Sequence, residues 1–186
     1  MRALIIVDVQ YDFMPGGALG VSQGDVIATP INRVRDRFDF VVFTQDWHPA
    51  DHCSFKVNGG MWPVHCVQGS KGAEIDARIL RDGDMIVKKG VNQDIDSYSG
   101  FWDNERKHKT GLDDLLKSKN IDTVYICGLA TDYCVKFTAL DAVDAGYRVF
   151  LIKDACRGVE VTPGDSERAV AEMLNAGVNV IESGKI

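Results

Sequence analysis

Cys134 lies in a stretch that suits a nucleophilic thiol. The apolar stretch Thr123–Cys127 before it predicts a buried strand, and residues 128–130 are small or apolar. If Thr131 caps the following helix, Cys134 is in its first turn, where unpaired N–H groups and the helix dipole favour a thiolate. The small residues would let backbone N–H groups approach a substrate oxygen, as in an oxyanion hole. A buried structural cysteine is the alternative, and this stretch alone does not decide between them.

A second group of residues has the character of a metal site. Asp46 precedes a loop that holds three of the four histidines in the chain: His48, His52 and His65. Imidazole and carboxylate ligands suit Zn, Fe or Mn, and they can leave positions open for water or substrate. Two cysteines, Cys53 and Cys66, adjoin histidines of this loop, so a structural Cys/His zinc knot is a competing interpretation, although the spacing does not match a zinc finger.

Charged residues also follow two other predicted strands. Asp8 ends the first apolar stretch, where a carboxylate would be either a general base beside a nucleophile or a cap for a nearby loop or helix. Lys88 and Lys89 end another strand, and strand alternation places only one of them on each face. One of the two could therefore turn inward to pair with Asp8 or a thiolate, and the spacing does not choose between them. The aromatic residues of 98–102 suit either the wall of a pocket for a flat substrate or ordinary packing.

The elements that must position these groups alternate along the chain. Strands are predicted at 3–9, 40–44, 85–88, 123–127, 147–153 and 178–182, and helices at 27–34, 111–117, 131–145 and 162–176, with Thr110, Thr131 and Thr162 as N-caps. This alternation predicts a three-layer α/β/α, Rossmann-like fold with a mainly parallel six-stranded sheet. In such folds ligands bind beyond the carboxyl ends of the strands, which is where the chemically capable residues fall. The long irregular stretches 47–71 and 92–109 are expected to lie there too.

Length and composition exclude several classes of protein. The chain has 186 residues, of which 45% are hydrophobic, so we expect one domain spanning 1–186 with a sizeable core. Its net charge of −6 argues against nucleic acid or an anionic membrane as a partner, and assembly into a homo-oligomer is compatible with it. No apolar run could cross a bilayer or form a signal-peptide core. We therefore expect a cytoplasmic location. In that reducing compartment the five cysteines, an odd number with no CxxC pair, should be thiols, ligands or a nucleophile rather than a disulfide framework.

Five stretches that occur in order resemble the nicotinamidase (pyrazinamidase) group of the isochorismatase-like cysteine hydrolase superfamily. Together they extend over most of the chain: residues 3–10 with Asp12 and Phe13, residues 46–49, residues 62–66, Lys89 ahead of residues 98–101, and residues 128–134. The resemblance implies an isochorismatase-like fold and an amidase that hydrolyses nicotinamide, and also pyrazinamide, through a cysteine thioester. Such an activity belongs to NAD salvage.

The resemblance also implies roles for particular residues. It places the catalytic triad on Asp8, Lys89 and Cys134, with Lys89 preferred to Lys88 because a small residue follows it. Metal ligands fall on Asp46, His48 and His65, with His52 as a further ligand in some members, and Zn is expected ahead of Fe or Mn. The ring-binding residues fall on Phe13, Trp62, Tyr98 and Leu129. The oxyanion hole falls on the backbone N–H groups of Ala130 and Cys134, beside a cis Leu129–Ala130 peptide.

Two alternatives remain at this point. One is an amidase of the same superfamily that acts on another small amide, such as a maleamate or an N-carbamoyl compound. The other is a non-catalytic zinc or thiol protein, which would use Cys53 and Cys66 and would show no selective reactivity at Cys134.

Overall fold

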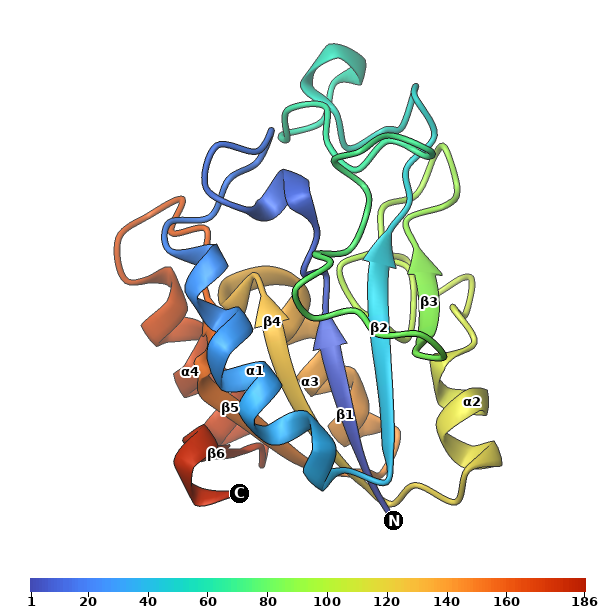
Figure 1. The fold of residues 1–186 in the computed structure, drawn as a ribbon. Helices are drawn as coiled ribbons and strands as arrows, with labels where there is room; N and C mark the ends of the chain where they lie inside the picture. Colours follow the sequence, from blue (N-terminus) through green and yellow to red (C-terminus); the bar gives the residue numbers. More distant parts are fainter.

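The computed structural model describes residues 1–186 and is built on a single six-stranded sheet (Figure 1). The strand order is β3-β2-β1-β4-β5-β6, and every neighbouring pair is parallel. The predicted parallel α/β sheet is therefore confirmed. The strands are β1 (Arg2–Val7), β2 (Phe40–Asp46), β3 (Met85–Lys89), β4 (Thr123–Leu129), β5 (Arg148–Arg157) and β6 (Asn179–Ile181).

Helices cover both faces of the sheet, as the alternating pattern predicts. In Figure 1 helix α1 lies in front of the sheet and α3 behind it, and α4 packs against α3. The helices are α1 (Ala28–Val34), α2 (Leu112–Ser118), α3 (Lys136–Asp144) and α4 (Asp165–Asn175). None of them combines the length and the apolar character needed to span a membrane.

The core is centred on β1 and β4, which are adjacent strands. Residues 3–7 of β1 are fully buried, and every residue of β4 is buried, because a parallel strand with helices on both sides has no solvent face. The chain passes from β1 to β2 on one side, whereas β4 leads to β5 on the other. This reversal of direction is the topological switch point at which α/β folds bind ligands.

Two predicted helix starts are wrong because the structure satisfies the helix N–H groups differently. A π-helical turn, Thr131–Val135, precedes α3, and Ala130 rather than Thr131 occupies the cap position, so Cys134 is the fourth residue of this turn. Helix α4 begins at Asp165 instead of Thr162. The carboxylate of Glu160, upstream of the expected start, accepts hydrogen bonds from the N–H groups that follow.

The third predicted cap is closer to the observed geometry. Helix α2 begins at Leu112, one residue later than expected, because Gly111 adopts a left-handed conformation in the cap position. Thr110 still acts on the helix end, since its Oγ1 accepts a hydrogen bond from the N–H of Leu112 at 3.2 Å.

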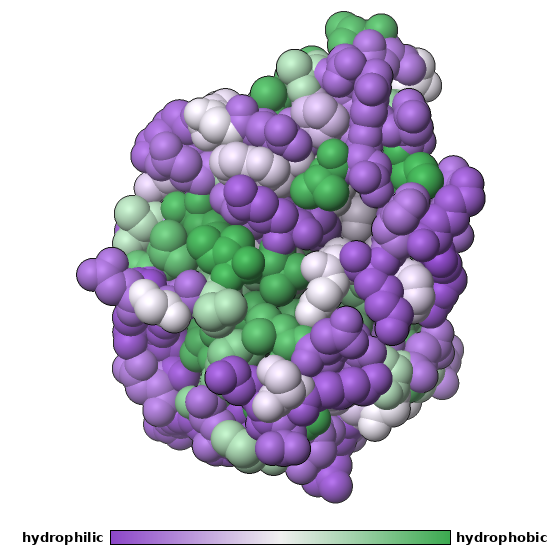
Figure 2. Space-filling model, turned by 90° about the vertical axis from the view of Figure 1, so that its right-hand side faces the viewer, coloured by the Kyte–Doolittle hydropathy of each residue, from purple (hydrophilic) through white to green (hydrophobic).

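The side of the molecule that carries the edge strand β3 is mostly hydrophilic but shows an apolar patch (Figure 2). Strand β3 contributes two exposed apolar side chains, Met85 and Ile86, at its first two positions. Its third and fifth residues, Val87 and Lys89, are buried. At the carboxyl end of this short edge strand, the side chains on one face are therefore buried in the interior.

The close approach of β4 to β1 depends on Gly128. Its φ is +119°, and a Cβ at this position would overlap the backbone of Val7. We expect Gly128→Ala to lower the free energy of unfolding by roughly 2–3 kcal/mol more than a glycine substitution that meets no atoms. Gly146→Ala is the matched control, because Gly146 also has a positive φ but has open space around it, and should cost about 1–2 kcal/mol. Denaturant titration measures both, and equal losses would contradict this account of the β1–β4 contact.

Candidate active site

The carboxyl ends of the strands and the long loops gather at one end of the molecule, at the top of Figure 1. Asp8 directly follows β1, Asp46 and Lys89 are the last residues of β2 and β3, and Cys134 lies in the turn after β4. The β2–β3 register pairs Asp46 with Lys89, and the β1–β4 register pairs Val7 with Gly128. Four chemically capable side chains from four strand ends are thereby brought to the switch point of the sheet.

Lys89 is the centre of this group. Its side chain is almost completely buried, and its Nζ lies 2.9 Å from Oδ2 of Asp8 and 2.6 Å from Oδ1 of Asp46. The same ammonium donates to the carbonyl oxygen of Ser97 at 2.7 Å and lies 3.4 Å from Sγ of Cys134. Burial opposes the charge, but Asp46 and Asp8 outweigh it and raise the pKa of Lys89 well above its ordinary value. Lys89 is therefore a fixed positive charge in contact with the thiol.

The neighbouring lysine has a different environment. Lys88 is exposed, and its Nζ lies 3.7 Å from the centre of the Trp47 ring. The alternation of the strand places the two side chains on opposite faces, and the structure turns Lys89 inward.

Asp8 is held in an unusual backbone conformation beside the turn Thr131–Val135, which contains Cys134. Its φ is +48°, in the left-handed region that non-glycine residues seldom occupy, and such conformations often persist at functional sites. Oδ1 accepts a hydrogen bond from Oγ1 of Thr44 at 2.6 Å, while Oδ2 faces Lys89. The carboxylate is fully buried and is one of a set with Asp46 and Cys134 whose polar atoms lie within 4.8 Å of one another.

Burial dominates the protonation of this site. It raises the pKa of Asp8 to about 6, although Lys89 acts in the opposite direction. Burial likewise raises the pKa of the Cys134 thiol well above its ordinary value, and Lys89 offsets this only in part. The expectation that the helix terminus favours a thiolate is therefore not met in the resting site. The thiol keeps its proton until a neighbouring group accepts it, and Asp8 is within reach.

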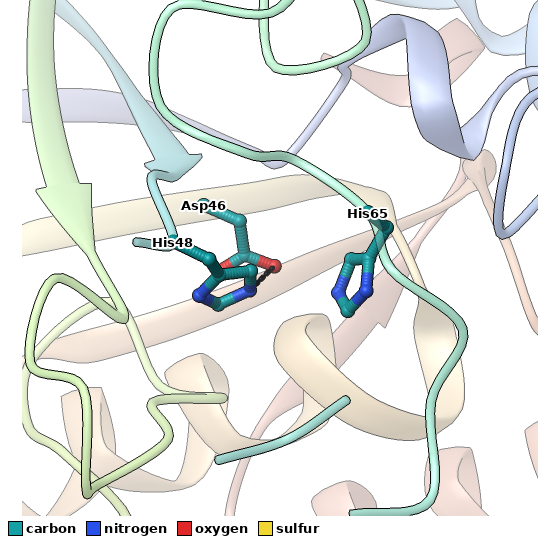
Figure 3. Close-up of side chains that lie close together, drawn as sticks. All are labelled: Asp46, His48 and His65. Atoms are coloured by element: carbon teal, nitrogen blue, oxygen red, sulfur yellow. Dashed lines mark ion pairs between the residues drawn. The ribbon is translucent and has the colours of Figure 1, made fainter. Parts of the chain in front are cut away.

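Asp46 connects the Lys89 group to the histidine group (Figure 3). Its Oδ1 bonds Lys89, and its Oδ2 lies 3.7 Å from Nε2 of His48. Asp46 and His48 extend from the end of β2, whereas His65 approaches from the facing loop. One polar atom from each of the three lies within 4.8 Å of the others. Burial opposes ionisation, but Lys89 and His48 hold the pKa of Asp46 below its usual range.

Both histidines are oriented by backbone carbonyls. Nδ1 of His48 lies 2.9 Å from the carbonyl oxygen of Gly90, and Nδ1 of His65 lies 2.8 Å from that of Pro63. This arrangement fixes the ring tautomer and leaves each Nε2 free to bind a metal, as in many metal sites. Two buried imidazoles and one carboxylate, with their free atoms together, fit a divalent transition metal.

His52 lies in a second group that overlaps the first. Its ring stacks on His48 at a centroid distance of 4.1 Å, and its polar atoms group with those of His48 and Asp96 rather than with Asp46. Nδ1 is 2.7 Å from Oγ of Ser54, whereas the buried Nε2 has no hydrogen-bond partner. The structure therefore places His52 beside the Asp46–His48–His65 group but not within it.

A pocket opens onto both groups. Aromatic side chains form much of its wall: Nε1 of Trp62 donates to the Tyr98 hydroxyl at 3.1 Å, and both rings pack edge-on against Tyr133. Phe13 packs edge-on against His65. The full lining is Phe13, Leu19, Asp46, Trp62, His65, Asp96, Tyr98, Ala130, Tyr133, Cys134 and Val159. The pocket thus combines a largely apolar lining with a thiol and with imidazole and carboxylate groups.

One residue expected at the pocket does not line it. Leu129 is fully buried, and its Cδ1 packs beside Gly24 in the core. As the last residue of the buried strand β4, it is surrounded by core atoms, while Ala130 after it reaches the pocket. The Leu129–Ala130 peptide is cis, as the resemblance implies.

Other lining residues were not identified from the sequence. Asp96 and Val159 lie in irregular segments, where no periodicity indicates which side chains face inward. Asp96 is two residues before Tyr98, and this closeness to an aromatic loop is the one local feature of the sequence that could indicate a place in the pocket. Val159 carried no signal at all.

Comparison with known proteins identifies the family. Residues 2–184 match the isochorismatase domain, and the chain belongs to this family. It is 45% identical over 199 residues to the nicotinamidase of Escherichia coli, covering 96% of this chain and 93% of that protein. The resemblance seen in the five motifs is therefore confirmed.

Solved structures agree with this assignment. A structure from L. infantum in complex with nicotinate superposes with a TM-score of 0.94 at 42% identity, covering 99% of this chain and 93% of that one. The pyrazinamidase of Pyrococcus horikoshii in complex with zinc has a TM-score of 0.87 at 42% identity, covering 97% and 98%.

The environment of Lys89 generates a stability prediction. Lys89→Met would leave Asp8 and Asp46 buried without a cation, so the free energy of unfolding should fall by roughly 3–5 kcal/mol. Lys88→Met is the matched control and should cost less than about 1 kcal/mol, because it removes only a cation–π contact at the surface. Denaturant unfolding of both variants measures the difference. A larger loss for Lys88→Met would show that the wrong lysine has been placed in the core.

Proposed function

We propose that this chain is a metal-dependent nicotinamidase, which hydrolyses nicotinamide to nicotinate and ammonia through a thioester on Cys134 and also accepts pyrazinamide. One observation carries the proposal above all. At the wall of a pocket lined largely by aromatic and other apolar side chains, Cys134 Sγ lies 3.4 Å from Lys89 Nζ, which is itself 2.9 Å from the buried carboxylate of Asp8. Relatives named nicotinamidase or pyrazinamidase support the substrate. We place the activity in NAD salvage and in a single domain spanning 1–186.

The pocket suits a small heteroaromatic amide. Phe13, Trp62 and Tyr98 supply aromatic surface to sandwich a pyridine ring. Phe13 is held by its contact with His65, and Trp62 by its hydrogen bond to Tyr98. The carboxamide would then point toward Cys134, and the ring nitrogen toward His65 and Asp46. A substrate without a flat ring would leave this aromatic surface uncovered.

The first half of the reaction forms the thioester and releases ammonia. Asp8 accepts the Cys134 proton, and the thiolate attacks the amide carbon to form the S–C bond. Lys89 stabilises the thiolate as the proton moves, because its charge lies against both groups. Asp8 then gives the proton to the amide nitrogen, the C–N bond breaks, and ammonia leaves.

The second half regenerates the free enzyme. A water molecule gives a proton to Asp8 and attacks the thioester carbon. The C–S bond breaks, Asp8 returns that proton to the Cys134 thiolate, and the acid leaves and ionises to nicotinate in solution. We assign the developing oxyanion in both halves to the backbone N–H groups of Ala130 and Cys134, and one such donor typically contributes about 3–4 kcal/mol. The carbonyl oxygen of Ala130 accepts bonds from the N–H groups of Tyr133 and Val135, which fixes the turn around these donors.

We assign a divalent metal to Asp46, His48 and His65, with Zn as the first expectation and Fe or Mn as alternatives. When bound there, the ion supplies a Lewis-acidic contact that can orient a nitrogen heterocycle. The thiol is the nucleophile in this scheme, so the metal site serves binding and orientation. The complex of the L. infantum protein with nicotinate and that of the P. horikoshii pyrazinamidase with zinc support a pyridine carboxylate and a zinc ion as ligands of this fold.

Activity tests the proposed nucleophile. Protein supplied with Zn²⁺ should release ammonia from nicotinamide, and Cys134→Ala should lower kcat by at least about 10⁴-fold, as removal of a covalent nucleophile does in comparable enzymes. Cys156→Ala is a matched control, because Cys156 is also a buried free thiol but does not line the pocket, and it should retain most of the activity. Substantial turnover by Cys134→Ala would exclude the covalent route.

Metal content tests the ligand assignment without reference to activity. Equilibrium dialysis against Zn²⁺ should give one equivalent for the wild-type protein and far less for His48→Ala or His65→Ala. The exposed fourth histidine provides the control: His108 pairs with Asp103 away from the pocket, so His108→Ala should bind like the wild type. We expect His52→Ala to keep the stoichiometry at lower affinity, since His52 groups with His48 and Asp96. Full Zn²⁺ binding by His48→Ala would contradict the assignment.

The alternatives from the sequence make different predictions. A structural Cys/His zinc knot requires Cys53 or Cys66 among the ligands, yet neither belongs to any of the three candidate metal groups in the structure. Another small amide, such as a maleamate or an N-carbamoyl compound, would be indicated if ammonia appeared from it faster than from nicotinamide. The aromatic wall favours nicotinamide.

A further inference from the structure

The segment that joins β5 to α4 forms one wall of the active-site pocket. We call residues 158–164 the strap. Val159 in the strap lines the pocket together with Phe13 and Cys134. Its side chain also packs against the hydrophobic core. The strap belongs to no helix or strand, and its position therefore depends on other contacts.

Asp132 supplies those contacts from the turn Thr131–Val135, which also contains Cys134. Its side chain is 5% exposed, and its two carboxylate oxygens accept hydrogen bonds from the N–H groups of Val159 at 2.9 Å and Glu160 at 2.8 Å. Two charge-assisted bonds to consecutive amides fix both the distance and the orientation of the strap. Asp132 is two residues before Cys134, so the thiol and the Val159 wall share one support.

The conformation of the strap allows its N–H groups to donate these bonds. Glu160 has a φ of +55°, a conformation that costs a non-glycine residue about 1–2 kcal/mol and therefore needs compensation. Its N–H is bonded to Asp132, and its own carboxylate caps α4 through the N–H groups of Gly164 and Ser166. Gly158 lies so close to the turn that a Cβ there would be 3.2 Å from Oδ1 of Asp132 and would overlap Oγ of Ser166.

We propose that Val159 is a specificity-determining residue of the substrate pocket and that Asp132 is the positioning residue that holds it against the ring. This inference rests on the proposed nicotinamidase activity. Neither residue takes part in bond making: Asp132 directs its carboxylate to the strap, and Val159 offers only methyl groups. Both residues act on binding of the ring, which is the same in the bound substrate and in the transition state. Their loss should therefore raise KM more than it lowers kcat.

The test is a double-mutant cycle on steady-state kinetics with nicotinamide. Asp132→Asn replaces one acceptor oxygen by an NH₂ group that cannot accept the strap amide, and Val159→Ala shortens the wall. Each variant should raise KM about tenfold, the scale of one lost apolar contact in a pocket, with kcat changed less than about threefold. The double variant should resemble either single variant, because Asp132 acts through Val159.

A matched control separates positioning from general loss of stability. Asp154, which lies on β5, is another carboxylate that accepts a hydrogen bond from the backbone of a distant segment. Its partner is the N–H of Ser183 at 2.8 Å, and Asp154 does not line the pocket. Asp154→Asn should keep KM within about twofold of wild type even if its Tm falls. Equal increases in KM for the two Asp→Asn variants would overturn the assignment of Asp132.

The remaining outcomes distinguish this inference from the proposed function. Additive effects in the double variant would show that Asp132 does not act through Val159. Val159→Ala removes no hydrogen bond, so it tests the wall even if Asp132→Asn fails to fold, and an unchanged KM for this variant would overturn the inference alone. If the wild-type protein supplied with Zn²⁺ releases no ammonia from nicotinamide, the proposed function fails, and this inference fails with it.

Discussion

The site depends on one buried ammonium group. Lys89 Nζ touches two carboxylates, a carbonyl oxygen and the Cys134 sulfur, and the two carboxylates would be unfavourable at such depth without it. Burial raises the pKa values of both Asp8 and Cys134, so the proton rests on the thiol and can pass to Asp8 as the reaction begins. Lys89 keeps the negative charge stable on whichever group releases the proton. Through Asp46 the same cation is connected to the histidine group.

The fold places this charge by strand register rather than by loop conformation. Asp46 and Lys89 are paired residues at the ends of β2 and β3. The side chain of Gln10 ties the end of β2 to the segment after β1: its Oε1 accepts the N–H of Asp46 at 2.8 Å, and its Nε2 donates to the carbonyl oxygens of Asp46 and Ala73. Asp46 and Lys89 thus lie on strands, while Asp8 directly follows β1 and Cys134 lies in the turn after β4.

Much of this arrangement could be predicted from the sequence, and the failures have physical causes. Buried parallel strands are continuous apolar runs, so the sheet and the residues at its edge could be predicted. Lys89 could not be separated from Lys88 by pattern, because a five-residue edge strand gives too little alternation to set its phase. The start of α4 depends on Glu160, whose conformation depends on Asp132, 28 residues away. Asp96 and Val159 lie in irregular segments, where side-chain direction has no period.

The central claim is that Cys134 carries the acyl group, and hydroxylamine trapping tests it most directly. With a thioester intermediate, added hydroxylamine should divert product from nicotinate to nicotinohydroxamate while ammonia release continues at an undiminished rate. The hydroxamate should disappear in Cys134→Ala and persist in Cys156→Ala. If the protein released ammonia at its full rate but formed no hydroxamate, water would be attacking the amide directly. The buried Lys89 network would then need a different role.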